Sequence, residues 1–214
     1  FVSSTLHVIS GDQSLKKRME KAMEVGEVSL VQYLEKVGAR FSVHALALAA
    51  TAGHEDCLRH ALRIGAKLPN PDDPYIQVYE GAVANGHLGC VELLNQSQFS
   101  IKKRVQRYGD YTIMPGLNLA YVAAKHGQLE CLKYLHSRRW PMRNVAEAAA
   151  EGGSLPCLCY LAAVHFHFNG QFHVAACVAA AKANQLHCLK FLLWSSDVGM
   201  AAAAYDSLDC LEYF

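Results

Sequence analysis

The hydrophobic positions of the chain recur in short blocks with the spacing of an α-helix. In the block HGQLECLKYL, residues 126–135, apolar residues stand two, four, five and eight positions after Gly127, at Leu129, Cys131, Leu132 and Leu135. These positions share one face of a helix with about 3.6 residues per turn. The block therefore predicts an amphipathic helix with one buried side.

Seven copies of this block follow one another at irregular intervals. Positions in each copy are counted from an anchor residue, usually glycine, and the anchors are Gly26, Gly53, Gly86, Gly127, Gly153, Asn184 and Asp206. Their spacings are 27, 33, 41, 26, 31 and 22 residues. An alanine-rich segment, such as 44–52 or 144–152, precedes most anchors. Alanine favours helices and glycine favours tight turns, so each copy predicts a helix, a turn and a second helix.

One such helix pair cannot bury its apolar face alone. Neighbouring pairs have to stack, and about three are needed for a stable core. The copies therefore predict an all-α solenoid of about seven helix-turn-helix repeats. We expect a single repeat domain over 1–214, with an insertion at about 95–116, where the anchor spacing is longest.

The segment ALALAATAGHEDCLRHALRIGA, residues 45–66, resembles an ankyrin repeat. It carries the alanine pair, the Gly-His turn, an aliphatic position and the closing Gly-Ala of that family, at Ala49, Ala50, Gly53, His54, Leu58, Gly65 and Ala66. The variant resembles the degenerate ankyrin arrays of protists and large DNA viruses, in which the phrase GHLECLKYL recurs. The resemblance implies a non-catalytic scaffold that binds other proteins, or a structural subunit of a larger assembly.

The sequence departs from the ankyrin pattern in two ways. The Thr-Pro-Leu-His start of the first helix is absent, and only one anchor spacing equals the usual 33 residues. The short spacings leave too little chain for β-hairpin fingers, so we expect few or none. One finger is expected at residues 165–173, HFHFNGQFH, because Asn169-Gly170 between alternating aromatic residues is a strong hairpin signal.

Composition narrows the choice of partners. Lys and Arg number 20 and Asp and Glu 19, so no overall charge directs the chain toward nucleic acid or an anionic membrane. No apolar run approaches the ~18 to 20 residues that cross a bilayer. We therefore expect protein partners, no membrane span and no small-molecule ligand. Because the chain begins with Phe1, we expect a processed or partial chain whose targeting signal is not visible.

Most of the eight cysteines share one position of the repeat. Position four, where ankyrin repeats usually carry Ile or Val, holds Cys57, Cys90, Cys131, Cys157, Cys188 and Cys210. Free Cys behaves as a small buried hydrophobic residue, so packing explains all six. Equivalent residues on stacked helices are roughly 8 to 10 Å apart, too far for a disulfide. We therefore expect a reducing compartment, the cytoplasm or nucleus before an organelle interior.

The other two cysteines stand outside that position. Cys177 matches a buried leucine of the first helix and is interpreted as packing. Cys159, at position six, is the candidate for an accessible thiol, and it points about 200° away from Cys157 on a helix. The pair is therefore not expected to share a metal.

Three groups of histidines have to be interpreted either as functional sites or as structural residues. His126 and His136 flank Cys131, but the repeat register accounts for them, and no hydrolase elbow, phosphate loop or HExxH motif occurs. The expected hairpin carries three imidazoles, at His165, His167 and His173, which could hold a metal. An exposed aromatic hairpin without a metal is favoured over this metal site. His54 and His87 follow their anchors, where the ankyrin resemblance implies a hydrogen bond to the neighbouring turn. We expect no enzyme activity, no metal and no cofactor.

Two groups of basic and aromatic residues are the candidate interface. The insertion carries Lys102, Lys103, Arg104, Arg107, Tyr108 and Tyr111. These residues suit an acidic protein segment or, as the alternative function, a nucleic-acid strand, although a solvated insertion is favoured. Arg138, Arg139 and Trp140 end a second helix, where an exposed Trp beside Arg is typical of binding hot spots and a Trp that caps the helix stack is equally consistent.

Overall fold

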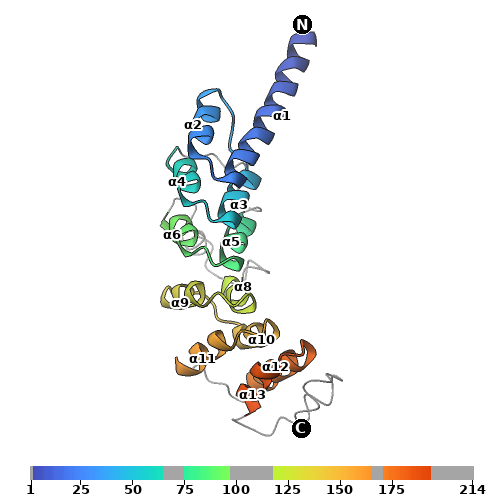
Figure 1. Ribbon diagram of the computed structural model, residues 1–214, viewed down its shortest axis with the longest axis vertical. Helices are drawn as coiled ribbons and strands as arrows, with labels where there is room; N and C mark the ends of the chain where they lie inside the picture. The colour runs from blue at the N-terminus through green and yellow to red at the C-terminus, as the bar shows by residue number, and fades with distance from the viewer. Residues whose placement is uncertain (1, 65–74, 97–117, 165–170, 194–214) are drawn as a thin grey trace. The chain divides into compact units, whose positions relative to one another are not determined.

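A computed structural model describes residues 2–64, 75–96, 118–164 and 171–193, and all secondary structure in these ranges is helical (Figure 1). The first three helix pairs are α1 (Val2–Val25) with α2 (Val28–Lys36), α3 (Val43–Ala52) with α4 (Glu55–Arg63), and α5 (Tyr75–Ala84) with α6 (Leu88–Gln96). The next three are α8 (Leu119–Lys125) with α9 (Leu129–Ser137), α10 (Val145–Glu151) with α11 (Leu155–Ala163), and α12 (Gln171–Lys182) with α13 (Leu186–Leu193).

These six pairs correspond to the first six copies of the sequence block, which confirms the all-α, paired-helix prediction. The seventh copy, anchored at Asp206, lies outside the described residues, as do residues 97–117 of the expected insertion. Helix α1 begins at Val2, well ahead of the first recognisable block, so it is longer than the other first helices.

The turn between the two helices of each pair has the geometry that the anchor residue predicts. The anchor glycines of the first five copies have φ values between 71° and 82°, in the left-handed region that disfavours side chains. Asn184, which replaces glycine in the sixth copy, has a φ of 54°. Asparagine tolerates this conformation better than most residues, which explains why it can stand there.

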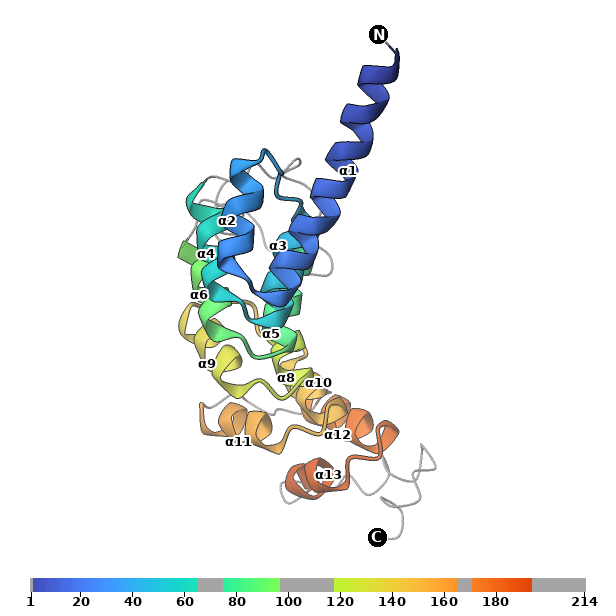
Figure 2. The ribbon, with the colours of Figure 1, turned by 45° about the horizontal axis from the view of Figure 1, so that its top comes forward.

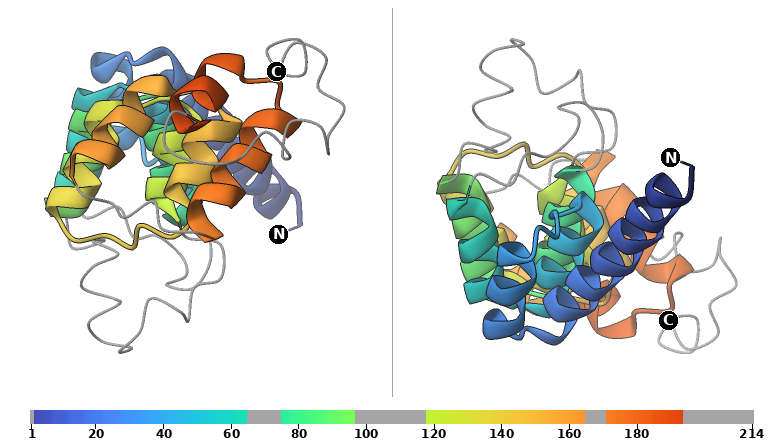
Figure 3. Two further views of the ribbon diagram at one scale, coloured as in Figure 1. Left: turned by 90° about the horizontal axis from the view of Figure 1, so that it is seen from below. Right: turned by 90° about the horizontal axis from the view of Figure 1, so that it is seen from above.

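The chain divides into two compact units, residues 1–115 and 116–214. In the first unit α1, α3 and α5 pack in one row and α2, α4 and α6 in a second row, as Figure 2 shows. In the second unit α8, α10 and α12 form one row and α9, α11 and α13 the other. Figure 3 shows the helices of each pair side by side when the rows are viewed end-on. The expectation of a single repeat domain over 1–214 stays a prediction.

Small residues form the contact between neighbouring first helices. Helix α3 buries Ala45, Ala49 and Ala50, and helices α8, α10 and α12 bury alanines at corresponding positions. The second helices contribute the residues at positions four, five and eight, such as Cys131, Leu132 and Leu135, which are at most 1% exposed. The apolar stripe in the sequence is therefore the core.

The hairpin predicted over residues 165–173 is wrong in its second arm. Gln171 to His173 form the first turn of α12 instead of a strand. The alanine-rich run that follows favours helix, and the helix extends backward through these residues. His173 therefore belongs to a helix, and residues 165–170 lie outside the described part of the chain.

Candidate protein-binding surfaces

The described cysteines at position four, together with Cys177, are packing residues. Each of these six side chains is at most 1% exposed. Burial raises the pKa of Cys90, Cys131, Cys177 and Cys188 to about 11, because a thiolate is poorly solvated in the core. These thiols are protonated at neutral pH and are not activated nucleophiles. Cys210 lies outside the described residues.

Cys159 differs from these six because its side chain is exposed on α11. We expect a thiol reagent such as iodoacetamide at neutral pH to modify Cys159 in the folded protein well before the buried cysteines, since reaction requires an accessible thiolate. Peptide mass spectrometry after short labelling measures this order. Equal labelling of Cys131 and Cys159 in the folded chain would contradict the packing described here.

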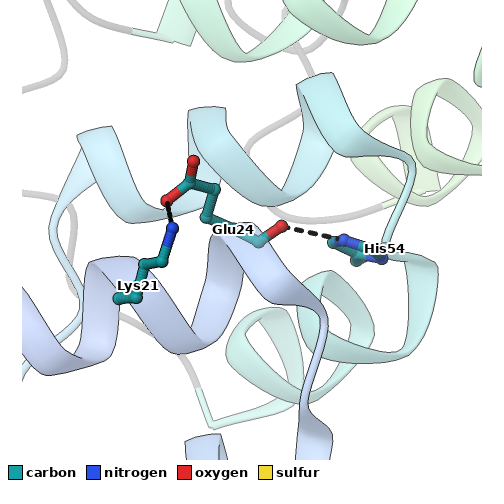
Figure 4. A network of polar contacts seen from close by, with 3 residues as sticks. All are labelled: Lys21, Glu24 and His54. Atoms are coloured by element: carbon teal, nitrogen blue, oxygen red, sulfur yellow. Dashed lines mark hydrogen bonds and ion pairs between the residues drawn. The ribbon is translucent and has the colours of Figure 1, made fainter.

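His54 and His87 tie successive helix pairs together. His54 Nε2 lies 3.0 Å from the carbonyl oxygen of Glu24 (Figure 4). In the same way, His87 Nε2 lies 3.1 Å from the carbonyl oxygen of Thr51. Each ring also lies against the anchor glycine of the preceding copy, Gly26 or Gly53. The structural role implied by the ankyrin resemblance is confirmed.

The remaining histidine and metal hypotheses find no support in the described residues. His136 Nδ1 lies 2.7 Å from the hydroxyl of Tyr160 on the next second helix, so this ring bridges two repeats. In the described ranges no group of three His, Cys, Asp or Glu side chains is placed to hold a metal. His165 and His167 lie outside those ranges.

Trp140 is not an exposed binding residue. Its side chain is only 3% exposed, so the hot-spot interpretation is wrong and the packing alternative is correct. The backbone explains this position, because Arg139 has a φ of 58° and the Trp140 amide donates to the Leu135 carbonyl at 3.1 Å, which folds the chain back onto the end of α9. The neighbouring Arg138 and Arg139 are exposed, and the Arg138 guanidinium lies 5.3 Å from the centre of the Tyr134 ring.

The basic and aromatic residues of the insertion cannot be placed, because Lys102 to Tyr111 lie outside the described residues. Their part in an interface stays a prediction. Within the described ranges no helix is long and apolar enough to cross a membrane.

A surface that the sequence did not indicate lies on the first helices of the second unit. Helices α10 and α12 line a groove of about 900 Å³. Its lining residues are Glu147, Glu151, Val174, Ala175, Val178, Ala179, Lys182 and Ala183. The lining alanines Ala175, Ala179 and Ala183 are spaced four residues apart along α12 and the residue that follows it, and Val174, which is 49% exposed, and Val178 stand beside them. The groove therefore combines an apolar wall with two carboxylates from α10 and the ammonium group of Lys182 at the end of α12.

The two carboxylates of the groove differ in their partners. Lys125 Nζ donates to Glu151 Oε1 at 2.7 Å, and the Tyr121 hydroxyl donates to Glu151 Oε2 at 2.8 Å. These two hydrogen bonds hold the pKa of Glu151 below its ordinary value. Among the described residues no hydrogen bond or ion pair engages the carboxylate of Glu147, so its charge is available to a ligand in the groove.

Comparison with known proteins supports the fold and does not assign a specific role. No protein-family model and no curated protein sequence matches the chain. Among solved structures 68 chains match. One is the crystal structure of the human ASB11 ankyrin repeat domain, which is similar with a TM-score of 0.62 at 16% identity, over 89% of this chain and 94% of that chain. The chain therefore has the fold of an ankyrin repeat domain, which is usually non-catalytic and typically binds proteins.

Proposed function

We propose that this chain is a non-catalytic scaffold that binds a protein segment in the groove between α10 and α12. The observation that carries the proposal is the groove itself, where exposed Val174 and partly exposed Val178 stand beside the carboxylate of Glu147. Such a site suits a segment with an aliphatic side chain and a nearby Lys or Arg. Burial of the aliphatic group would supply affinity, and the charge of Glu147 would fix its register.

The polar network beneath Glu151 supports a preformed site. Tyr121 and Lys125 hold both oxygens of that carboxylate, so the α10 wall keeps its shape before a partner arrives. A preformed wall lowers the ordering cost of association. The same groove could serve a transient scaffold or a permanent subunit of a larger assembly. We also propose that the protein resides in the cytoplasm or the nucleus.

Substitution of Val174 by Glu should weaken binding of the native partner by about tenfold or more, because a charge then occupies the apolar wall. Partner capture from native extract, followed by titration of the identified partner by calorimetry, measures the effect.

Glu147→Lys should weaken binding of a basic segment in the same assay. The matched control is Ala162→Glu, which places the same charge on exposed α11 of the same unit. A partner that binds the Val174→Glu and wild-type chains equally would exclude this groove.

A further inference from the structure

Three exposed arginines stand on the short connection between α9 and α10 in the second unit. They are Arg138, Arg139 and Arg143. We call this connection, residues 138–144, the arginine loop. Arg139 and Arg143 are four residues apart, so their Cα atoms are separated by at most about 14 Å even in a fully extended chain. Long arginine side chains on such a short segment can reach one ligand together.

The carboxylates of the second unit do not neutralise the arginine loop. In the described part of this unit Lys and Arg outnumber Asp and Glu by seven to three. Two of the three glutamates already pair with lysines at 2.7 Å, Glu130 with Lys133 and Glu151 with Lys125. The third, Glu147, lines the groove. Within the described ranges none of the three arginines forms an ion pair, so the loop presents positive charge that lacks a partner.

The backbone of the arginine loop is held in place before a ligand binds. The buried Trp140 side chain anchors its middle in the core. The Asn118 side-chain amide donates to the Arg143 carbonyl at 2.6 Å, which fixes its far end. The Arg138 guanidinium lies against the Tyr134 ring, and a guanidinium that contacts a ring through its face can still donate hydrogen bonds from its edge. A preformed loop of this kind lowers the ordering cost of binding.

Arg139 stands at a position of the repeat where glycine would fit better. Position twelve holds Gly38 in the first copy and Gly65 in the second. In the fourth copy it holds Arg139, whose φ of 58° lies in the left-handed region that disfavours a side chain. Backbone strain that glycine would relieve is found mostly at functional sites. Because the Arg139 side chain is exposed, packing in the core does not explain its presence, and a role in binding does.

We propose that the arginine loop binds an acidic protein segment, whose Asp or Glu side chains pair with Arg138, Arg139 and Arg143. A planar guanidinium can donate two parallel hydrogen bonds to one carboxylate, which suits arginine to this partner. A nucleic-acid strand is less favoured, because single strands are bound largely by aromatic rings that stack on the bases. Trp140 is buried in the core, and the Tyr134 ring is already in contact with Arg138.

Fluorescence anisotropy of a labelled Glu-rich peptide, titrated with the whole chain, tests the proposal. The wild-type chain should bind this peptide and should not bind the same peptide with Gln in place of Glu. Arg139→Gly should weaken binding by about three- to tenfold, because one guanidinium is lost. The same variant should raise the unfolding midpoint of the second unit by a few degrees, because glycine relieves the left-handed strain. Weaker binding by a more stable chain cannot result from misfolding.

The matched control is Arg59→Gln on α4 of the first unit, which removes the same charge from an exposed arginine that lies 3.7 Å from Glu55. This variant should bind the Glu-rich peptide as the wild-type chain does. Equal weakening by Arg59→Gln and Arg139→Gly would overturn the proposal, since overall charge would then account for the binding.

Three further results would also overturn it. One is a wild-type chain that does not bind the Glu-rich peptide, and another is unchanged binding when Arg138→Gln, Arg139→Gly and Arg143→Gln are combined. The third is tighter binding of a labelled oligothymidylate than of the peptide, lost in the combined variant, which would assign the loop to nucleic acid. None of these results bears on the α10–α12 groove, which the Val174→Glu experiment tests separately.

Discussion

Replacing Leu132 by Ala is expected to lower the free energy of unfolding of the second unit by about 2 to 5 kcal/mol. Leu132 stands at position five on α9 and is fully buried, so the truncation removes apolar contact and leaves a cavity in a closely packed stack. Urea denaturation followed by circular dichroism measures the loss. Because the chain has two compact units, the transition that shifts should be assigned to the second unit before a two-state free energy is extracted.

The neighbouring residue provides the control for this experiment. Lys133→Ala changes a side chain that is 43% exposed and pairs with Glu130 on the same helix, at 2.7 Å. Its effect should stay within about 0.5 kcal/mol, as for most surface substitutions. A cost for Leu132→Ala as small as that of Lys133→Ala would show that position five does not face the core.

The repeat pattern predicted the core because it depends on local spacing. Positions four, five and eight fall on one side of any helix that follows the anchor, so Cys131, Leu132 and Leu135 could be assigned to the core from the sequence. The anchor turns were predictable for the same reason, since five of the first six anchors are glycine and need a positive φ. A helix reaching back to Val2 was not predicted, because residues ahead of the first block show no repeat.

The surfaces were less predictable because they depend on which helices become neighbours. The groove needs Val174 of α12 and Glu147 of α10 to line the same space, and nothing in either segment indicates this. The sequence left open whether Trp140 is exposed or packed, because the turn that buries it uses a left-handed residue, Arg139, that is not glycine. The sequence shows such a turn only when glycine or asparagine stands in it.

Gly53→Ala is expected to destabilise the first unit by about 2 to 4 kcal/mol, more than a glycine substitution at a surface turn. Its φ of 79° costs a side chain about 1 to 2 kcal/mol. In addition, a Cβ at this residue would lie 2.6 Å from His87 Nδ1, so the ring that bonds the Thr51 carbonyl would have to move. Urea denaturation of the whole chain, read from the transition of the first unit, measures the sum of these two costs.

Gly38 separates the two contributions, because its φ is 96° but no atom lies within 4 Å of the place a Cβ would take. Gly38→Ala should therefore show the conformational cost alone, about 1 to 2 kcal/mol. In a His87→Ala background the cost of Gly53→Ala should fall to the same value, because the colliding ring is gone, and a double-mutant cycle isolates that coupling. If Gly53→Ala costs the same with and without His87, the close approach of ring and glycine does not hold the two repeats together, and the anchor glycine is required only for the shape of its turn.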